Sequence, residues 1–149
     1  MKRFFAILLL LSILITTGCA PDRCAQDILL RFCEEYPISA NVYSSLSDEG
    51  DAGYIDKDML NTLYGTDKLG IGEFALALYG KVDTVREVGV FVIEMGDDEL
   101  ELTELISRRI DFLSSFTDGE GFIRKYRGVI VYGFVDNASS ATDLFDRII

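Results

Sequence analysis

The sequence has no histidine and no tryptophan, and it has only two prolines and three cysteines in 149 residues. Without histidine, the chain cannot build a Ser-His-Asp or Cys-His catalytic centre, a metal site with imidazole ligands or an imidazole pH switch. The motifs G-x-S-x-G, H-E-x-x-H and C-x-x-C are also absent. The sequence therefore predicts no catalytic residue, no metal site and no cofactor.

Basic side chains are scarce: 14 Lys and Arg stand against 25 Asp and Glu, which gives a formal charge of −11 at pH 7. A chain of this charge repels polyanions, so we expect no nucleic-acid partner. The acidity does not indicate disorder, because 49% of the residues are hydrophobic and ten Phe and seven Tyr are among them. The chain can therefore bury a substantial core.

One long hydrophobic run is present, at the N-terminus. Lys2 and Arg3 precede twelve mainly apolar residues, 4–15, and small residues follow, an arrangement typical of a secretory signal peptide. As a helix, the run would reach about 18 Å, short of a hydrocarbon core of about 30 Å, which disfavours a permanent transmembrane anchor. The run therefore predicts export.

The end of this segment, Thr16-Thr17-Gly18-Cys19, resembles the bacterial lipobox. The resemblance implies that Cys19 is diacylated, with palmitate as a typical chain, and becomes the new N-terminus. Thr16 departs from the pattern, which prefers leucine at this position. We expect the lipid on Cys19, and a plain cleaved signal peptide and an uncleaved anchor are the alternatives.

This assignment predicts three segments: a lipoprotein signal peptide over residues 1–18, a short lipid-anchored tether over 19–23 and a single domain over 24–149. Without residues 1–18 the chain has 131 residues, the size of one domain. Its formal charge is then −13, because 12 basic side chains remain against 25 acidic ones. We expect the domain to lie close to the bilayer at the extracytoplasmic face of the cell membrane, with the lipid as its membrane contact.

The hydrophobic patterning predicts an α+β domain, in which helices pack on a mostly antiparallel sheet of three to four strands. Strands follow one another in pairs without a crossover helix, which favours antiparallel pairing. Residues 39–55 are rich in Ser, Gly and Asp and predict a loop with a short extended piece near Val42. The expected helices cover 22–36, 57–65, 97–116 and 140–148, and the expected strands cover 73–82, 87–95, 122–126 and 129–135.

Local signals set the expected ends of the helices. Asp22 and Asp56 are expected to cap the first two helices, and Pro37 and Gly65 to end them. Ser140 and Asp143 resemble a capping box for the last helix.

Two apolar stretches have alternative interpretations. The string Gly70 to Ala75 fits G-x-G-x-x-A, but a short helix rather than a strand precedes it, so we interpret it as a turn and not as a dinucleotide site. The strand over 129–135 is apolar on both faces, which predicts a central strand covered on both sides. An exposed patch for a partner is the alternative for this strand.

Arg108 and Arg109 are adjacent on an expected helix and point in different directions. One is expected to pair with Glu104 or Asp111 on the surface, and the other to meet a buried carboxylate such as Glu87. A ligand-binding arginine is the alternative.

Cys24 and Cys33 are poor candidates for a disulfide. On one helix they would lie about 13 Å apart, beyond the limit of about 7 Å between the Cα atoms of a disulfide. Cys33 is expected to be a buried free thiol on the apolar face, and Cys24 receives no role.

The acidic stretches "SDEGDAGYIDKD" and "GDDELE" raise a calcium hypothesis. The first does not match an EF-hand loop that begins at Asp48, because Gly50, Ala52 and Met59 occupy ligand positions. Solvated loop acids and acids at a helix N-terminus are the simpler interpretation.

Five features of the sequence belong together: the lipobox-like Cys19, "YIDKDMLNTLYGTD" with Tyr64-Gly65, "REVGVFVIE" with Glu87 to Phe91, the Arg108-Arg109 pair, and "RGVIVYGFVDNASSATDLF" with its turn at Gly128. In these features the chain resembles a family of small lipoproteins of Gram-positive bacteria that is known only as a domain of unknown function. The resemblance covers about residues 24–149 and implies a location and a fold class but no activity.

Together these features predict a lipid-anchored extracytoplasmic protein that acts as a non-enzymatic binding or interaction module of the cell envelope, with an envelope protein as a candidate partner. A carboxylate-dependent hydrolase acting on cell-wall or glycan substrates is the first alternative. A calcium-responsive acidic envelope protein is the second. A cleft with two close carboxylates would favour the hydrolase, and an exposed apolar or aromatic surface would favour the binding module.

Overall fold

The computed structural model describes residues 24–36, 38–81, 84–93 and 98–149. In these ranges four helices pack on a five-stranded antiparallel sheet, so the predicted α+β class is confirmed. The sheet has five strands rather than three to four. The additional strand is the short extended piece that was expected near Val42, which pairs with its neighbour along its whole length.

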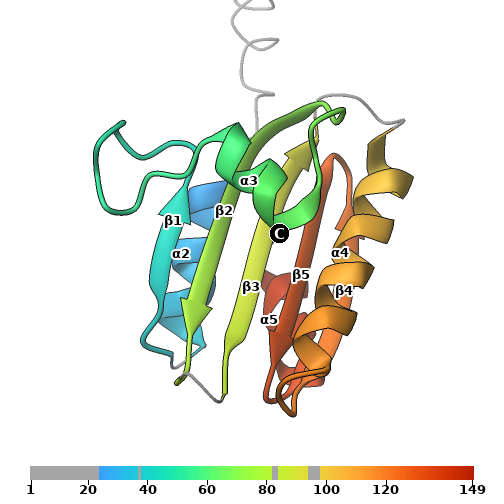
Figure 1. The fold of residues 1–149 in the computed structure, drawn as a ribbon. Helices are drawn as coiled ribbons and strands as arrows, with labels where there is room; N and C mark the ends of the chain where they lie inside the picture. Colours follow the sequence, from blue (N-terminus) through green and yellow to red (C-terminus); the bar gives the residue numbers. More distant parts are fainter. Residues whose placement is uncertain (1–23, 37, 82–83, 94–97) are drawn as a thin grey trace, which may run out of the picture.

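The strand order is β1-β2-β3-β5-β4, with every neighbouring pair antiparallel. Helices α2 and α5 cover one face of the sheet, and α3 and α4 lie on the other (Figure 1). The elements are α2 (Ala25–Glu35), β1 (Asn41–Ser44), α3 (Lys57–Tyr64), β2 (Ile71–Tyr79), β3 (Arg86–Ile93), α4 (Asp98–Ser114), β4 (Glu120–Tyr126), β5 (Val129–Val135) and α5 (Ala138–Ile148).

The α2/α5 face is a closed apolar core. Phe32 of α2 stacks on Phe145 of α5 with 4.4 Å between ring centroids, and both rings are fully buried. The sheet contributes small side chains beneath these rings, which lets the two helices approach it closely. These small side chains are Ala75, Ala77, Val88, Val90, Val131 and Val135.

The α3/α4 face is covered less completely, because α3 has only eight residues. Larger side chains rise from the sheet to meet the two helices. The buried side chains of this face, from the sheet, the two helices and the loop before α3, are Ile55, Leu60, Tyr64, Ile71, Phe74, Leu76, Phe91, Leu102, Ile106, Ile130 and Tyr132.

Several predicted local features are confirmed. Asp56 caps α3 by accepting a hydrogen bond from the backbone N–H of Met59 at 2.7 Å. Gly65 ends this helix in the left-handed conformation, at φ +75°, where glycine is favoured. Strand β5 is interior and covered on both faces, as its two-sided apolar pattern predicted.

Two expectations are wrong. Ser140 is not the cap of the last helix: α5 begins at Ala138, and Asn137 caps it by accepting a hydrogen bond from the Ser140 N–H at 2.8 Å. The stretch from Ile71 to Ala75 is not a turn but the start of β2. Its glycine, Gly72, sits at an irregularity in the pairing with β3, which explains why a strand contains a turn-like string.

The start of α2 is fixed to one end of the sheet. Asp22 and Pro37 lie outside the described residues, and the cap of α2 is Cys24, whose Sγ accepts from the Asp27 N–H at 3.4 Å. The backbone N–H of Ala25 donates to the Glu73 carboxylate at 3.0 Å. The first turn of α2 and the start of β2 therefore lie at the same end of the sheet.

Candidate functional site

A buried polar cluster lies under α3 and α4. Glu87 of β3 is 1% exposed and is met by side chains from three other elements. Arg109 of α4 donates to both carboxylate oxygens, from Nη2 to Oε2 at 2.6 Å and from Nε to Oε1 at 3.2 Å. The hydroxyl groups of Tyr64 (α3, 2.8 Å) and Tyr132 (β5) contact Oε1 as well, and they also contact each other. The predicted meeting of one arginine with Glu87 is thus confirmed, for Arg109.

Tyr132 reaches this cluster because a glycine of the neighbouring strand leaves room for its ring. Gly89 lies directly opposite Tyr132 in the β3–β5 pairing. A Cβ atom at Gly89 would lie 2.1 Å from Cε1 of the Tyr132 ring, so no other residue fits there without displacing the ring. The glycine in the middle of β3 therefore marks a close approach of a side chain to the backbone.

Both tyrosines of the cluster are protonated at neutral pH, as the direction of their pKa shifts indicates. Burial, and then the charge of Glu87, raise the pKa of both Tyr64 and Tyr132 well above the usual value of tyrosine, so both keep their protons. The two hydroxyl groups and Oε1 of Glu87 make three mutual contacts. Because only two hydroxyl protons are present, only two of these contacts can be hydrogen bonds at one time. Burial alone would lower the pKa of Arg109, but its hydrogen bonds to Glu87 and the charge of that residue raise it overall. Arg109 is thereby held as a fixed cation.

Arg109 also faces a cavity between α3 and α4. This cavity, called here the α3–α4 cavity, has a volume of about 560 Å³. The Arg109 side chain is 19% exposed, and its guanidinium lies 5.6 Å from the ring centroid of Phe112. The cavity is lined by Thr62, Leu63, Tyr64, Gly65, Glu101, Leu105, Arg108, Arg109 and Phe112.

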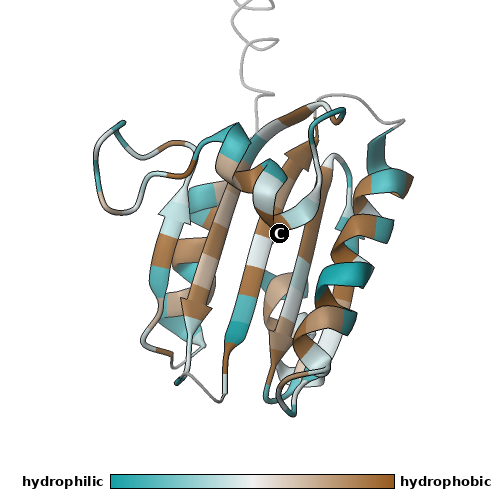
Figure 2. Cartoon of the chain, in the orientation of Figure 1, coloured by the Kyte–Doolittle hydropathy of each residue, from teal (hydrophilic) through white to brown (hydrophobic). Residues whose placement is uncertain are grey.

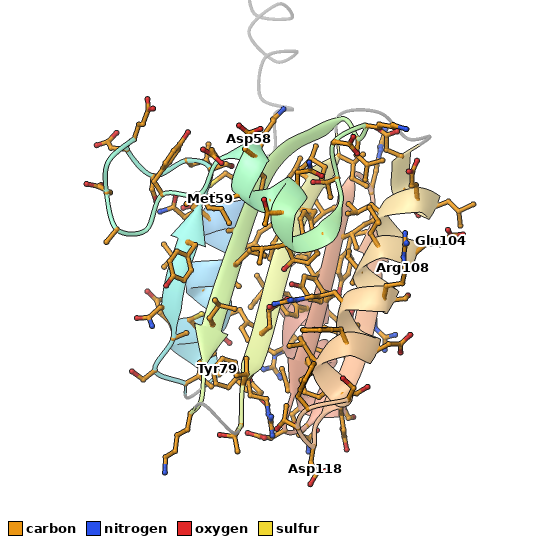
Figure 3. The ribbon with its side chains drawn as sticks, in the orientation of Figure 1. Asp58, Met59, Tyr79, Glu104, Arg108 and Asp118 are labelled. Carbon is orange, nitrogen blue, oxygen red and sulfur yellow. The ribbon has the colours of Figure 1, made fainter. Side chains whose placement is uncertain are left out.

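Arg108 is the second cation of this cavity. Its side chain is exposed, and within the described ranges it forms no ion pair with Glu104, Asp111 or any other acid. The expected surface pairing of this arginine is therefore wrong. Figure 3 labels Arg108 on α4 and Met59 on the opposite side of α3.

A second cavity lies on the other side of α3, over β1 and β2. This cavity, called here the sheet groove, has a volume of about 390 Å³ and a largely apolar wall. Figure 2 shows hydrophobic residues along this part of the sheet. The lining residues are Tyr43, Ala52, Tyr54, Ile55, Met59, Thr62, Leu63, Leu76 and Leu78. Thr62 and Leu63 belong to both cavities, so the two cavities meet at the second half of α3.

Carboxylates are few in these cavities. The sheet groove has none, and the α3–α4 cavity has Glu101 alone. A smaller cavity of about 140 Å³ is lined by Asp58 and Asp67, both of which are exposed. In the part of the chain that the structure describes, no group of three or more His, Cys, Asp or Glu side chains could hold a metal ion. The calcium hypothesis thus finds no set of ligands there.

The cysteines have separate positions. Cys19 lies outside the described residues. Cys24 and Cys33 are free thiols, as expected, but Cys33 is half-buried rather than buried, and it packs against the edge of the α2/α5 core. Burial raises the pKa of Cys33 to about 11, which favours the neutral thiol over the nucleophilic thiolate at neutral pH.

Comparisons of the chain with protein-family models, with curated protein sequences and with solved structures find no match. The resemblance to a lipoprotein family therefore stays a prediction. Among the helices of the described ranges, none combines the length and the apolar character needed to cross a bilayer.

Proposed function

We propose that this chain is a lipid-anchored, extracytoplasmic binding module of the cell envelope with no catalytic role. The observation that supports binding is the pair of adjoining cavities on either side of α3, one cationic and one apolar. The buried cluster behind them supports a structural role for Glu87, because its carboxylate is fully engaged by Arg109 and two tyrosines. A general acid or base needs a free carboxylate in a cleft.

The membrane location in this proposal depends on the signal peptide and on a short tether. Four residues lie between Cys19 and Cys24, which caps α2. Extended, the five Cα–Cα steps from Cys19 to Cys24 span at most about 18 Å. Because Glu73 holds the first turn of α2, the acylated residue would keep this end of the sheet near the bilayer. Loop 45–55 and the start of α3 belong to the same end, since the Ser45 N–H donates to the Phe74 carbonyl.

Mass spectrometry of the protein from its own membranes tests the anchor. We expect a diacylated N-terminal cysteine at Cys19, and release of the Cys19→Ser variant from the membrane. An unmodified N-terminus at or beyond Cys19 would contradict the anchor.

A second assay tests the absence of catalysis. The purified protein, incubated with cell-wall glycan, is expected to release no reducing ends above a buffer blank. Release that scales with protein concentration and is abolished by Asp58→Asn or Asp67→Asn would establish the hydrolase instead. Those two residues are chosen because both carboxylates line the same small cavity.

A further inference from the structure

The two cavities differ in chemistry, lie on either side of α3 and meet at Thr62 and Leu63 in its second half. The α3–α4 cavity presents Arg108 and Arg109, and the sheet groove is largely apolar. We propose that together they bind an anionic amphiphile, whose carboxylate or phosphate head contacts the two arginines and whose alkyl chain crosses Leu63 into the sheet groove. This inference rests on the proposed binding function and names its ligand class.

The head group is inferred from the state of the two arginines. Arg109 is fixed by two hydrogen bonds to Glu87, which leaves its Nη1 without a partner among the described residues. Arg108 is exposed and has no described ion pair. Guanidinium groups match carboxylate and phosphate oxygens in geometry and charge. Glu101 is the single carboxylate of the cavity, so two cations face one anion.

The alkyl chain of the ligand is inferred from the sheet groove. Its floor is formed by Leu76 and Leu78 of β2 and its rim by Met59 and Leu63 of α3. Met59 is 54% exposed and Leu63 is 40% exposed, which is a high exposure for two apolar side chains one helical turn apart. A volume of about 390 Å³ lies within the usual range for sites that take small molecules.

Charge around the groove fixes the direction of the ligand. Ala52 and Tyr54, from the loop that precedes α3, also line the groove. The loop that carries them also carries the exposed acids Asp48, Glu49 and Asp51. These acids repel an anionic head, so the head belongs at the arginine end and the alkyl chain at the loop end.

Photo-crosslinking in a bilayer tests the proposal. The purified full chain is reconstituted in phosphatidylcholine vesicles and exposed to decanoic acid that carries a terminal diazirine. Matched probes carry the same chain with an alcohol or a trimethylammonium head. We expect adducts on groove residues such as Met59 and Leu63, about fivefold more with the carboxylate than with either matched probe.

Two charge reversals test the head-group contact. Arg108→Glu is expected to lower labelling by the decanoic acid probe about tenfold. Arg124→Glu changes the net charge equally on exposed β4, away from both cavities, and is expected to change labelling less than twofold. Both residues are exposed and lack described ion pairs, so both variants should fold. Equal labelling by the three heads, adducts outside the groove, or equal effects of the two reversals would each overturn the proposal.

A further probe distinguishes the source of the ligand. Phosphatidylglycerol with a diazirine in its acyl chain replaces the decanoic acid in the same vesicles. Adducts in the groove from this lipid alone identify a bilayer lipid as the ligand, and adducts from decanoic acid alone identify a free amphiphile. If neither probe labels the groove while Cys19 is acylated, the amphiphile proposal is rejected, and the proposed lipid anchor is not affected.

Discussion

The two faces of the sheet are built by different means. On the α2/α5 face, two eleven-residue helices close an apolar core in which stacked Phe32 and Phe145 lie over small side chains. On the α3/α4 face, a short helix and a long one bury a charged cluster at Glu87 and leave two cavities open. The first face is a closed apolar core. The second face buries the polar cluster around Glu87 and keeps two cavities at the surface. We propose that the second face, with its two cavities, is the binding face.

The largest expected effect is on the packed face. Phe145→Ala removes a fully buried ring from the α2/α5 core and should lower the free energy of unfolding by about 3–5 kcal/mol. Phe116→Ala is the matched control, because this ring is 71% exposed and its removal should cost less than about 0.5 kcal/mol. Urea denaturation measures both. Similar losses for the two variants would contradict the packed core.

The charged cluster gives the next effect. Arg109→Met leaves the Glu87 carboxylate buried without its cation and should cost about 3 kcal/mol, at the low end for breaking a buried pair because Arg109 is partly exposed. Adding Glu87→Gln removes the uncompensated charge and keeps an acceptor for the tyrosines. The double variant should therefore be more stable than Arg109→Met alone. A double variant that is less stable than the single one would show that the charge on Glu87 is not the cause of the loss.

The tyrosines should respond in opposite ways. Tyr132→Phe removes a donor to Glu87 and should cost about 1–3 kcal/mol at pH 7. Tyr79→Phe should be neutral or slightly stabilising, because the buried Tyr79 hydroxyl has no hydrogen-bond partner in the described structure. Chemical denaturation of both variants checks this contrast, and a loss at Tyr79 equal to that at Tyr132 would contradict it.

The same cluster predicts a pH dependence. The folded-state pKa values of Tyr64 and Tyr132 are raised above their unfolded values near 10. Their contribution to the free energy of unfolding is therefore complete below about pH 10 and is lost as the pH rises above it. Unfolding free energies measured from pH 8 to 11 should fall at the alkaline end. The fall should be shallower in Tyr132→Phe, and an equal slope in both proteins would contradict the assignment.

The smallest effect tests the start of α5. Asn137→Ala removes the observed cap and should cost about 1 kcal/mol. Ser140→Ala should cost less than about 0.5 kcal/mol, because the Ser140 side chain is exposed and is not the cap. Thermal unfolding of the two variants decides between Asn137 and the capping box suggested by the sequence.

The fold was predictable where one pattern dominated a segment. Strands β3 and β5 and helix α4 have long, strongly periodic or apolar sequences, and their positions agree with the expectation. Strand β1 was underestimated because four residues give little periodicity. It is stabilised by pairing with β2 and by an isolated β-bridge between Ser44 and Tyr54. Both contacts join residues that are distant in the sequence.

The site was predictable only in part. Adjacent residues of a helix point in different directions, and from this the sequence predicted that one arginine of the 108–109 pair meets a buried carboxylate such as Glu87. The arrival of Tyr64 and Tyr132 at the same carboxylate depends on where α3 crosses the sheet, which no local pattern specifies. Gly89 was the available signal, since a glycine within a strong strand marks a close approach. The cavities depend on the shortness of α3 relative to the sheet.

Hydrogen–deuterium exchange of the full chain in phosphatidylcholine vesicles, with and without decanoate, tests most directly whether the α3/α4 face is the binding face. We predict slower exchange in peptides that cover α3 and residues 105–112, and unchanged exchange in peptides that cover α2 and α5. Protection confined to α2 and α5, or unchanged exchange on both faces, would contradict it.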